Sequence, residues 1–121
     1  MSSEIEKLFD QIQTFTDIRD WSQFHTPKNL VLAAVGEMGE LAELLQWKNN
    51  LEIKEYLNTT EGKNRFAEEI ADVAIYLIRL CQVTNINFLD AIKNKIEINE
   101  VKYPVKISKG NSEKYTKLKY D

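Results

Sequence analysis

Apolar residues recur at helical spacing along nearly the whole chain. Between residues 5 and 15 they fall at intervals of three and four, which predicts an amphipathic first helix built on Ile5, Leu8, Phe9, Ile12 and Phe15. A loop over residues 19–25 follows. Thr26 is a typical N-cap, and Pro27 suits the first helical position, where a missing N–H costs nothing. We therefore expect a second helix from Pro27 to about Lys48.

The same pattern predicts the remaining elements. Asn49-Asn50 interrupts the second helix, and residues 52–57 are expected to form a short helical turn. Thr59 or Thr60 is a candidate cap for a third helix that ends near Val83. Asn87 is expected to cap a fourth helix that runs to about Lys102 and stops before Pro104. No segment alternates like a strand, so the fold class is all-α.

Two of these helices are apolar on more than one side. Residues 30–34 form an unbroken apolar run, and residues 73–81 contain only Tyr76 and Arg79 as polar breaks. A helix that is apolar nearly all round needs burial on all sides, which four helices from one chain do not provide. We therefore predict a four-helix-bundle-type core completed by homo-oligomerisation. The predicted helical domain covers residues 1–104, and residues 105–121 form an irregular, Lys-rich C-terminal tail.

Composition narrows the classes of function. The 121 residues contain 16 Lys and Arg against 19 Asp and Glu, a net charge of −3, which argues against a protein that coats a nucleic-acid polymer. The single Cys81 allows no intramolecular disulfide, as is usual in a reducing compartment. The polar, acidic first residues do not resemble a signal peptide, and no apolar run reaches the length of a membrane span. A cytoplasmic protein without membrane contact is expected.

Two acidic pairs carry the candidate chemistry. Glu37 and Glu40 lie three residues apart in the second helix, and Glu69 and Asp72 repeat this spacing in the third. Each pair therefore shares a helix face, where like charges repel. Of the four acids only Glu69 has a cation one turn away, namely Arg65. Unpaired charges in such apolar helices are costly, and a divalent cation would offset that cost.

The type of ligand indicates the type of metal. Carboxylate oxygens select Mg²⁺, with Mn²⁺ as a substitute, over zinc or copper. A di-iron bundle also uses inward-facing glutamates but needs two Glu-x-x-His motifs, and His25 is the only histidine. Mg²⁺ held by carboxylates usually completes its shell with water and substrate phosphates. The alternative is that the four acids are simply solvated, as most charged helix residues are.

The chain resembles the all-α MazG-like nucleoside triphosphate pyrophosphohydrolases, most closely the dCTP pyrophosphatase branch, over about residues 5–116. The resemblance rests on the spacing of the two acidic pairs and on their surroundings. These surroundings are Arg19-Asp20-Trp21, Phe24-His25-x-Pro27-x-Asn29-Leu30, Gly36-Glu37-x-Gly39-Glu40-Leu41-Ala42-Glu43-Leu44 with Gln46-Trp47, Asp72-Val73-x-Ile75-Tyr76-Leu77, Tyr103-Pro104-Val105 and Lys114-Tyr115-Thr116.

The resemblance implies an activity and a set of site residues. A (d)NTP would be hydrolysed between the α- and β-phosphates, giving (d)NMP and pyrophosphate, in a homotetramer built as a dimer of dimers. The implied ligands of one or two Mg²⁺ ions, which would clamp the phosphates and activate a water, are Glu37, Glu40, Glu69 and Asp72. Glu37 is our candidate for the general base. The implied substrate-binding residues are Trp21, Trp47, Tyr76, Lys95 and Asn99.

One position departs from the branch and leaves the substrate open. Some of these relatives have a histidine in the first helix facing the base, where this chain has Ile12. A preference for dCTP with some breadth is therefore expected, in a role that cleans or balances nucleotide pools. Two alternatives stay open: the same fold acting on dUTP or another nucleotide, and a non-catalytic helical module whose acidic stripe binds a basic partner.

Overall fold

A computed structural model describes residues 3–118, and every regular element in that range is a helix. The all-α prediction is confirmed. The chain divides into two compact units, residues 1–86 and 87–121. The first unit contains α1 (Glu4–Asp17), the 3₁₀ turn η1 (Ser22–Phe24), α2 (Pro27–Leu45), α3 (Asn50–Asn58) and α4 (Thr60–Thr84). The second contains α5 (Phe88–Lys102), α6 (Val105–Ser108) and η2 (Tyr115–Lys117).

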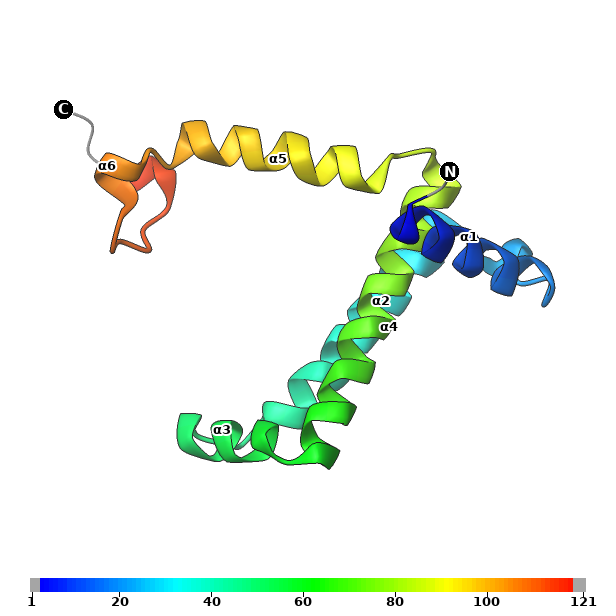
Figure 1. Ribbon diagram of the computed structural model, residues 1–121, viewed down its shortest axis with the longest axis horizontal. Helices are drawn as coiled ribbons and strands as arrows, with labels where there is room; N and C mark the ends of the chain where they lie inside the picture. Colours follow the sequence, from blue (N-terminus) through cyan, green and yellow to red (C-terminus); the bar gives the residue numbers. More distant parts are fainter. Residues whose placement is uncertain (1–2, 119–121) are drawn as a thin grey trace. The chain divides into compact units, whose positions relative to one another are not determined.

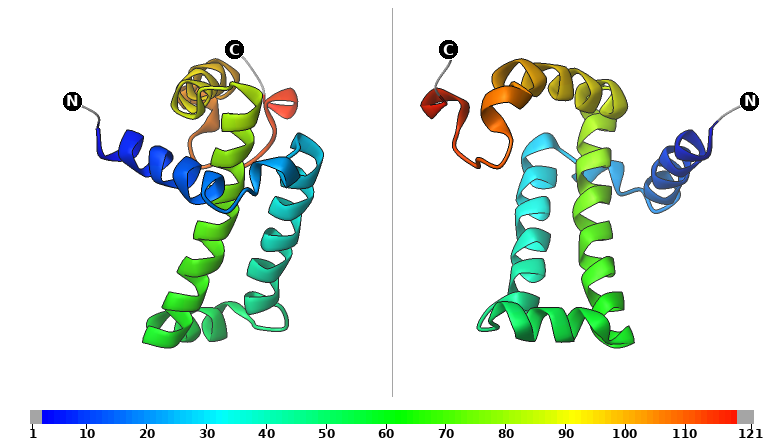
Figure 2. Two further views of the ribbon diagram at one scale, coloured as in Figure 1. Left: turned by 90° about the vertical axis from the view of Figure 1, so that its right-hand side faces the viewer. Right: turned by 60° about the vertical axis from the view of Figure 1, so that its left-hand side comes forward.

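The centre of the first unit is an antiparallel pair of helices. α2 and α4 run side by side, and α3 crosses between their ends (Figures 1 and 2). Thr26 caps α2 by accepting a hydrogen bond from the Asn29 N–H at 3.2 Å, with Pro27 in the first turn, as the sequence predicts. Thr59, the first of the two candidate caps, serves α4 in the same way. These caps fix where the two central helices begin.

The turn between the central helices is more regular than expected. The residues predicted to form a short turn belong to the nine-residue helix α3. It begins with a capping box, in which Asn49 and Glu52 each accept a hydrogen bond from the other's backbone N–H, at 2.9 and 3.1 Å. The first turn of α4 then passes so close to α3 that a Cβ on Gly62 would collide with the backbone carbonyl of Tyr56. Only glycine allows this approach.

The ends of the central helices differ slightly from the prediction. α2 stops at Leu45 rather than near Lys48, because Trp47 has a positive φ of 70° that a helix does not allow. α4 runs to Thr84, one residue beyond the expected end, and is closed by Asn85 in the left-handed conformation. The early end of α2 removes Trp47 from the helix.

Long-range hydrogen bonds tie α1 to the C-terminal half of α4. α1 itself begins with a capping box between Ser3 and Glu6. The Gln82 side chain donates to the carbonyl of Phe9 at 2.9 Å, and the Arg79 guanidinium donates to the Gln13 side chain at 2.7 Å. Arg79 is only 4% exposed, so these bonds lie away from bulk water. They position α1 across the end of the central pair.

The second unit begins as the sequence predicts. Asn87 caps α5 by accepting a hydrogen bond from the Asp90 N–H, and the helix ends at Lys102 before Pro104. Beyond it, the expected irregular tail contains α6 and η2, and the rings of Tyr103 and Tyr115 meet edge to face at 6.2 Å. The predicted boundary between residues 104 and 105 stays a prediction.

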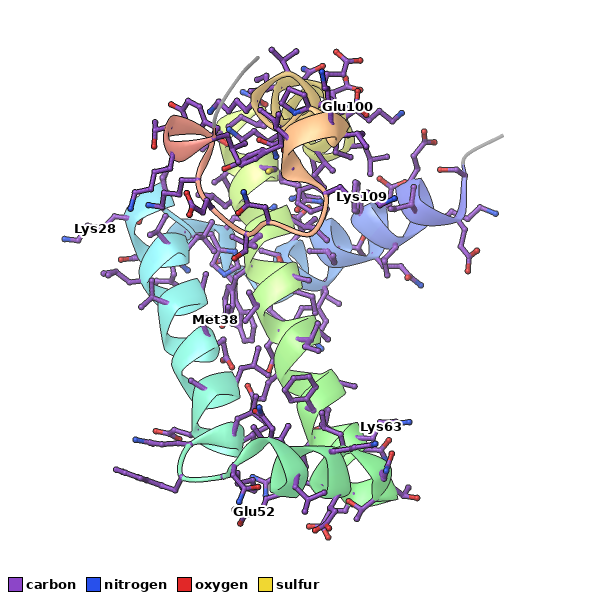
Figure 3. The ribbon with its side chains drawn as sticks, turned by 90° about the vertical axis from the view of Figure 1, so that its left-hand side faces the viewer. Lys28, Met38, Glu52, Lys63, Glu100 and Lys109 are labelled. Atoms are coloured by element: carbon purple, nitrogen blue, oxygen red, sulfur yellow. The ribbon has the colours of Figure 1, made fainter. Side chains whose placement is uncertain are left out.

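The first unit buries very little apolar surface by itself. Its buried apolar residues, within the described range, are Leu30, Ala34 and Ile78, and of these only Leu30 is fully buried. Polar side chains such as Lys28, Glu52 and Lys63 point outward, as expected (Figure 3). Large apolar side chains on both central helices are also exposed, among them Val31, Leu32, Val35, Met38, Ile70, Ile75 and Leu77. No helix within residues 3–118 is both long and apolar enough to span a membrane.

Candidate active site

The two acidic pairs face each other across the central helices. Glu37 and Glu40 lie on α2, and Glu69 on the antiparallel α4. One carboxylate oxygen from each of these three residues lies within 4.8 Å of the others. Two oxygen ligands on opposite sides of one Mg²⁺ are about 4.2 Å apart, since each bond is about 2.1 Å long. The spacing of the three oxygens therefore suits a single hard divalent cation.

Two carboxylate oxygens in this cluster lack partners. Oε2 of Glu37 and Oε2 of Glu69 are buried, and neither has a hydrogen-bond partner. Burial, close side-chain contact with Glu69 and Glu40, and the charges of Glu40 and Asp72 together raise the pKa of Glu37 to about 7. A buried, unpaired acceptor is costly, and a cation between the carboxylates would satisfy both oxygens. The residues present therefore fit the metal that the sequence predicts.

The fourth predicted ligand lies beside this cluster. Asp72 is exposed and falls outside the three-carboxylate group, although its charge contributes to the raised pKa of Glu37. It lies one turn beyond Glu69 on α4 and lines the neighbouring pocket. Asp72 thus connects the acidic cluster to that pocket.

The pocket beside Asp72 has a volume of about 420 Å³ and is lined by residues of α1 and α4 and by Trp21 and His25, which flank η1. Trp21 and Tyr76, two of the predicted substrate-binding residues, both line it. The Trp21 ring packs edge to face on Phe15, with 5.7 Å between ring centroids. The full lining is Gln11, Ile12, Phe15, Thr16, Trp21, His25, Asp72, Ile75, Tyr76 and Arg79. Its size and aromatic walls suit a small planar ligand.

The other three predicted substrate-binding residues are not part of this pocket. Trp47 follows the C-terminal end of α2 and is 91% exposed, whereas Trp21 precedes the N-terminal end. The 19 residues of α2 separate them by roughly 28 Å, so the two rings of one protomer do not enclose the same ligand. Lys95 and Asn99 lie four residues apart on α5, in the second unit. All three stay predicted ligands.

A second hollow lies on the other side of the acidic cluster. It has a volume of about 450 Å³ and is mostly polar, lined by Glu40, Glu43, Leu44, Lys48, Tyr56, Arg65 and Glu69. The Lys48 ammonium donates to the carbonyl of Leu44 at 2.8 Å and lies 4.9 Å from the centre of the Tyr56 ring. Lys48 and Arg65 therefore bring two positive charges next to the carboxylates.

Sequence reasoning missed Arg79 and Lys48 as site residues. Arg79 follows Tyr76 by three residues and Asp72 by seven, so all three share one face of α4. That spacing, together with a lone cation in an apolar stretch, was the available signal. His25 Nδ1 accepts a hydrogen bond from Arg79 Nε at 3.0 Å.

Comparison with known proteins identifies the family of the chain. A sequence model of the MazG-like family matches residues 32–118. The chain belongs to the MazG-like family. It is 43% identical to mouse dCTP pyrophosphatase 1 and 42% identical to the human protein of that name, in each case over 86% of this chain. The chain spans 61% of the length of these relatives.

A solved structure extends the likeness to the fold. A pyrophosphatase from Archaeoglobus fulgidus is similar to this MazG-like chain with a TM-score of 0.80 and 44% sequence identity, covering 86% of this chain and 95% of the other. The resemblance drawn from the sequence is thereby confirmed. The roles of individual site residues in this MazG-like protein stay predictions, supported by the geometry described above.

Proposed function

We propose that this chain is a Mg²⁺-dependent nucleoside triphosphate pyrophosphohydrolase that converts a (d)NTP into a (d)NMP and pyrophosphate, with dCTP as a preferred substrate. The observation that carries the proposal is the acidic cluster with two buried, unpartnered carboxylate oxygens, next to an aromatic pocket on the same helix. The names of the mouse, human and Archaeoglobus relatives support it.

The arrangement of the site suggests how the nucleotide is oriented along α4. In the proposed complex the nucleoside occupies the pocket between Trp21 and Tyr76, and the phosphates extend along α4 past Asp72 and Glu69. The β- and γ-phosphates then lie near the second hollow, where Lys48 and Arg65 offset their negative charge. The bond between the α- and β-phosphates is thereby placed at the acidic cluster.

The four acids share one task in this proposal, and Glu37 has a second one. Glu37, Glu40, Glu69 and Asp72 would hold Mg²⁺, or Mn²⁺ in its place. When bound, the ion supplies positive charge to the phosphate oxygens and makes water easier to deprotonate. Glu37 doubles as the proposed general base: its carboxylate lies in the cluster, and in the metal-free protein burial and the neighbouring carboxylates raise its pKa to about 7. Trp21 and Tyr76 hold the base and exclude water from one side.

We also propose that the active form is a homo-oligomer, as a dimer of dimers. Three buried apolar residues among those described in the first unit are too few for a stable core, and the exposed apolar surface of α2 and α4 would be covered by a second copy. Such an assembly would allow the exposed Trp47 of one protomer to reach the pocket of another. Light scattering at micromolar concentration tests this proposal, and a monomer would contradict it.

The activity is tested by a screen of the common NTPs and dNTPs with Mg²⁺, in which monophosphate and pyrophosphate are measured together. Equal amounts of the two products support cleavage between the α- and β-phosphates. Release of a diphosphate and inorganic phosphate would contradict the proposed bond. Absence of turnover, with no Mg²⁺-dependent stabilisation, would instead favour a non-catalytic helical module.

A further inference from the structure

Arg79 is a buried cation whose hydrogen-bond partners are all uncharged. It is 4% exposed, and it donates to side chains on α1, in η1, in the following loop and on α4 itself. Buried arginines are ordinarily paired with a carboxylate, because an uncompensated charge away from water is costly. The acceptors of Arg79 are Gln13 Oε1, Ser22 Oγ, His25 Nδ1 and Gln82 Oε1. Gln13 and Ser22 in turn donate to Asp17 Oδ1 at 2.9 and 3.1 Å, so the nearest carboxylate of the network is one hydrogen bond removed from the guanidinium. The network holds the guanidinium in one orientation without a direct ion pair.

The network leaves one N–H of the guanidinium without a partner. Nε donates to His25 at 3.0 Å, and the two hydrogens of Nη1 are used by Gln13 at 2.7 Å and Gln82 at 3.1 Å. Nη2 donates to Ser22 at 3.2 Å. An arginine has five N–H donors, so a second hydrogen on Nη2 has no acceptor among residues 3–118.

Arg79 lines the aromatic pocket at a defined distance from the phosphate end. Asp72 and Arg79 both line it, and they lie seven residues apart on α4, which is two helical turns or roughly 10 Å. That separation is comparable with the length of a nucleoside from its 5′ oxygen to the far edge of its base. A nucleotide with its phosphates at the acidic cluster would therefore bring the edge of the base to Arg79. Ile12, which lines the same pocket, offers no side-chain hydrogen bond.

We propose that Arg79 is a specificity-determining residue that donates a hydrogen bond from Nη2 to an acceptor atom, a ring nitrogen or a carbonyl oxygen, on the base of the nucleotide. The inference rests on the proposed function and adds to it the group that recognises the base, the Arg79 guanidinium. Aromatic walls bind any base, because every base has a π-face. A donor fixed in a buried site instead rejects analogues that lack the matching acceptor.

His25 has a supporting role in this arrangement. It accepts a hydrogen bond at Nδ1, which requires that this nitrogen be unprotonated. Burial and the charge of Arg79 lower the pKa of His25 and so keep the ring neutral. His25 is thus a positioning residue that holds the guanidinium through Nε.

The first test compares two substrates with the Arg79→Met variant. The substrates are the best dNTP from the screen and deoxyribose 5′-triphosphate, which has no base. Loss of a charged hydrogen bond is expected to lower kcat/KM for the dNTP by roughly 10- to 100-fold. The value for the base-free triphosphate should change by no more than about twofold. Equal losses for both substrates would mean that Arg79 acts only through the structure.

Gln13→Leu is the matched control. It removes the shortest hydrogen bond of the same network and the tie to α1, but Gln13 does not line the pocket. Because three of the four hydrogen bonds of Arg79 remain in Gln13→Leu, we expect the ratio of kcat/KM between the two substrates to change much less than in Arg79→Met. A ratio altered as much as in Arg79→Met would assign the effect to the position of α1 and overturn the proposal.

A second measurement uses the unaltered protein and does not depend on the folding of a variant. Analogues of the best dNTP in which one acceptor atom of the base is replaced by C–H are compared with the parent nucleotide. One of them should lose at least tenfold in kcat/KM, and unchanged values for every analogue would overturn the role of Arg79. A wild-type protein that hydrolyses no nucleotide would contradict the proposed function itself, which is a different result.

Discussion

The acidic cluster and the Arg79 network both include residues of α4, but they differ in whether their buried polar atoms have hydrogen-bond partners. In the network, four guanidinium N–H groups already have protein acceptors. In the cluster, Glu37 and Glu69 each bury an oxygen without a partner. The network is therefore complete apart from one donor, whereas the cluster leaves two buried acceptors unsatisfied. In the proposed function, α4 thus carries a preformed region that binds the nucleoside, the Arg79 network, and an incomplete region that a cation would complete, the acidic cluster.

The largest expected effect is a loss of kcat when a charge is removed from the acidic cluster, the incomplete region. Glu40→Gln, Glu69→Gln and Asp72→Asn should each lower kcat on the order of 10²-fold or more, because each keeps the size of a side chain but removes a charged ligand. The measurement is pyrophosphate release under saturating Mg²⁺. Glu68→Gln is the control, since Glu68 is exposed on the same helix and lines neither pocket. Near-normal rates in all three variants would remove the metal site from the proposal.

A second prediction concerns folding stability. In the proposed function Mg²⁺ binds only the folded cluster, so at 100 times its Kd it should stabilise the wild-type protein by about 2.7 kcal/mol. Thermal unfolding with Mg²⁺ and with a chelator measures the difference. In Glu69→Gln the stabilisation should shrink markedly, whereas Gln13→Leu, which alters the preformed region, should keep it. A wild-type Tm that does not respond to Mg²⁺ would contradict a cluster that a cation completes.

Substitution of Trp47 tests whether a second protomer completes the nucleoside pocket. Trp47→Ala should weaken all nucleotides by a similar factor, about 1–3 kcal/mol in kcat/KM, because stacking does not discriminate among bases. The ring is 91% exposed in the single chain, so its loss should leave the Tm of an isolated protomer unchanged. Measurements with dCTP, dATP, dTTP and dUTP decide this. No change for any of the four would exclude Trp47 from the pocket.

A further prediction concerns the pH dependence of the metal-free protein, which tests the incomplete region without its ligand. The pKa of Glu37 is raised from 4.5 to about 7, so between these values the folded state binds more protons than the unfolded state. Its contribution to stability is therefore present below pH 4.5 and is lost as the pH rises through 7. Glu37→Gln removes this loss, and its Tm advantage over wild type in a chelator should grow from pH 5 to pH 8. A constant difference would contradict the raised pKa.

The local signals of the sequence predicted much of the fold. Helix caps act over three residues, so Thr26 and Asn87 could be recognised without knowing what surrounds them. The same holds for the acidic pairs, because residues three apart share a helix face whatever packs against it. The capping box of Asn49 and Glu52 was also readable as a helix start, but the prediction took Asn49 only as a break.

The parts that were missed depend on contacts between distant residues. The partners of Arg79 on α1 and near η1 lie 66, 57 and 54 positions away, and no local pattern identifies them. The left-handed backbone at Trp47 is likewise not dictated by neighbouring residue types. Tertiary contacts decide the Arg79 network, whereas Trp47 is 91% exposed and nothing among residues 3–118 of the single chain packs against it. The two tryptophans lie at opposite ends of α2 because of the length of that helix, so two residues that the resemblance implied for substrate binding are far apart in one protomer.

The separation of the two tryptophans also gives the molecule two independent optical reporters. The chain has two Trp residues, one packed on Phe15 at the pocket and one almost fully surrounded by water. Indole emission shifts to shorter wavelength when water leaves the ring. A protein that retains only Trp21 therefore reports on occupation of the pocket, and one that retains only Trp47 reports on whatever surface comes to cover the end of α2. The same two side chains thus allow nucleotide binding and assembly to be followed separately in solution, without any added label.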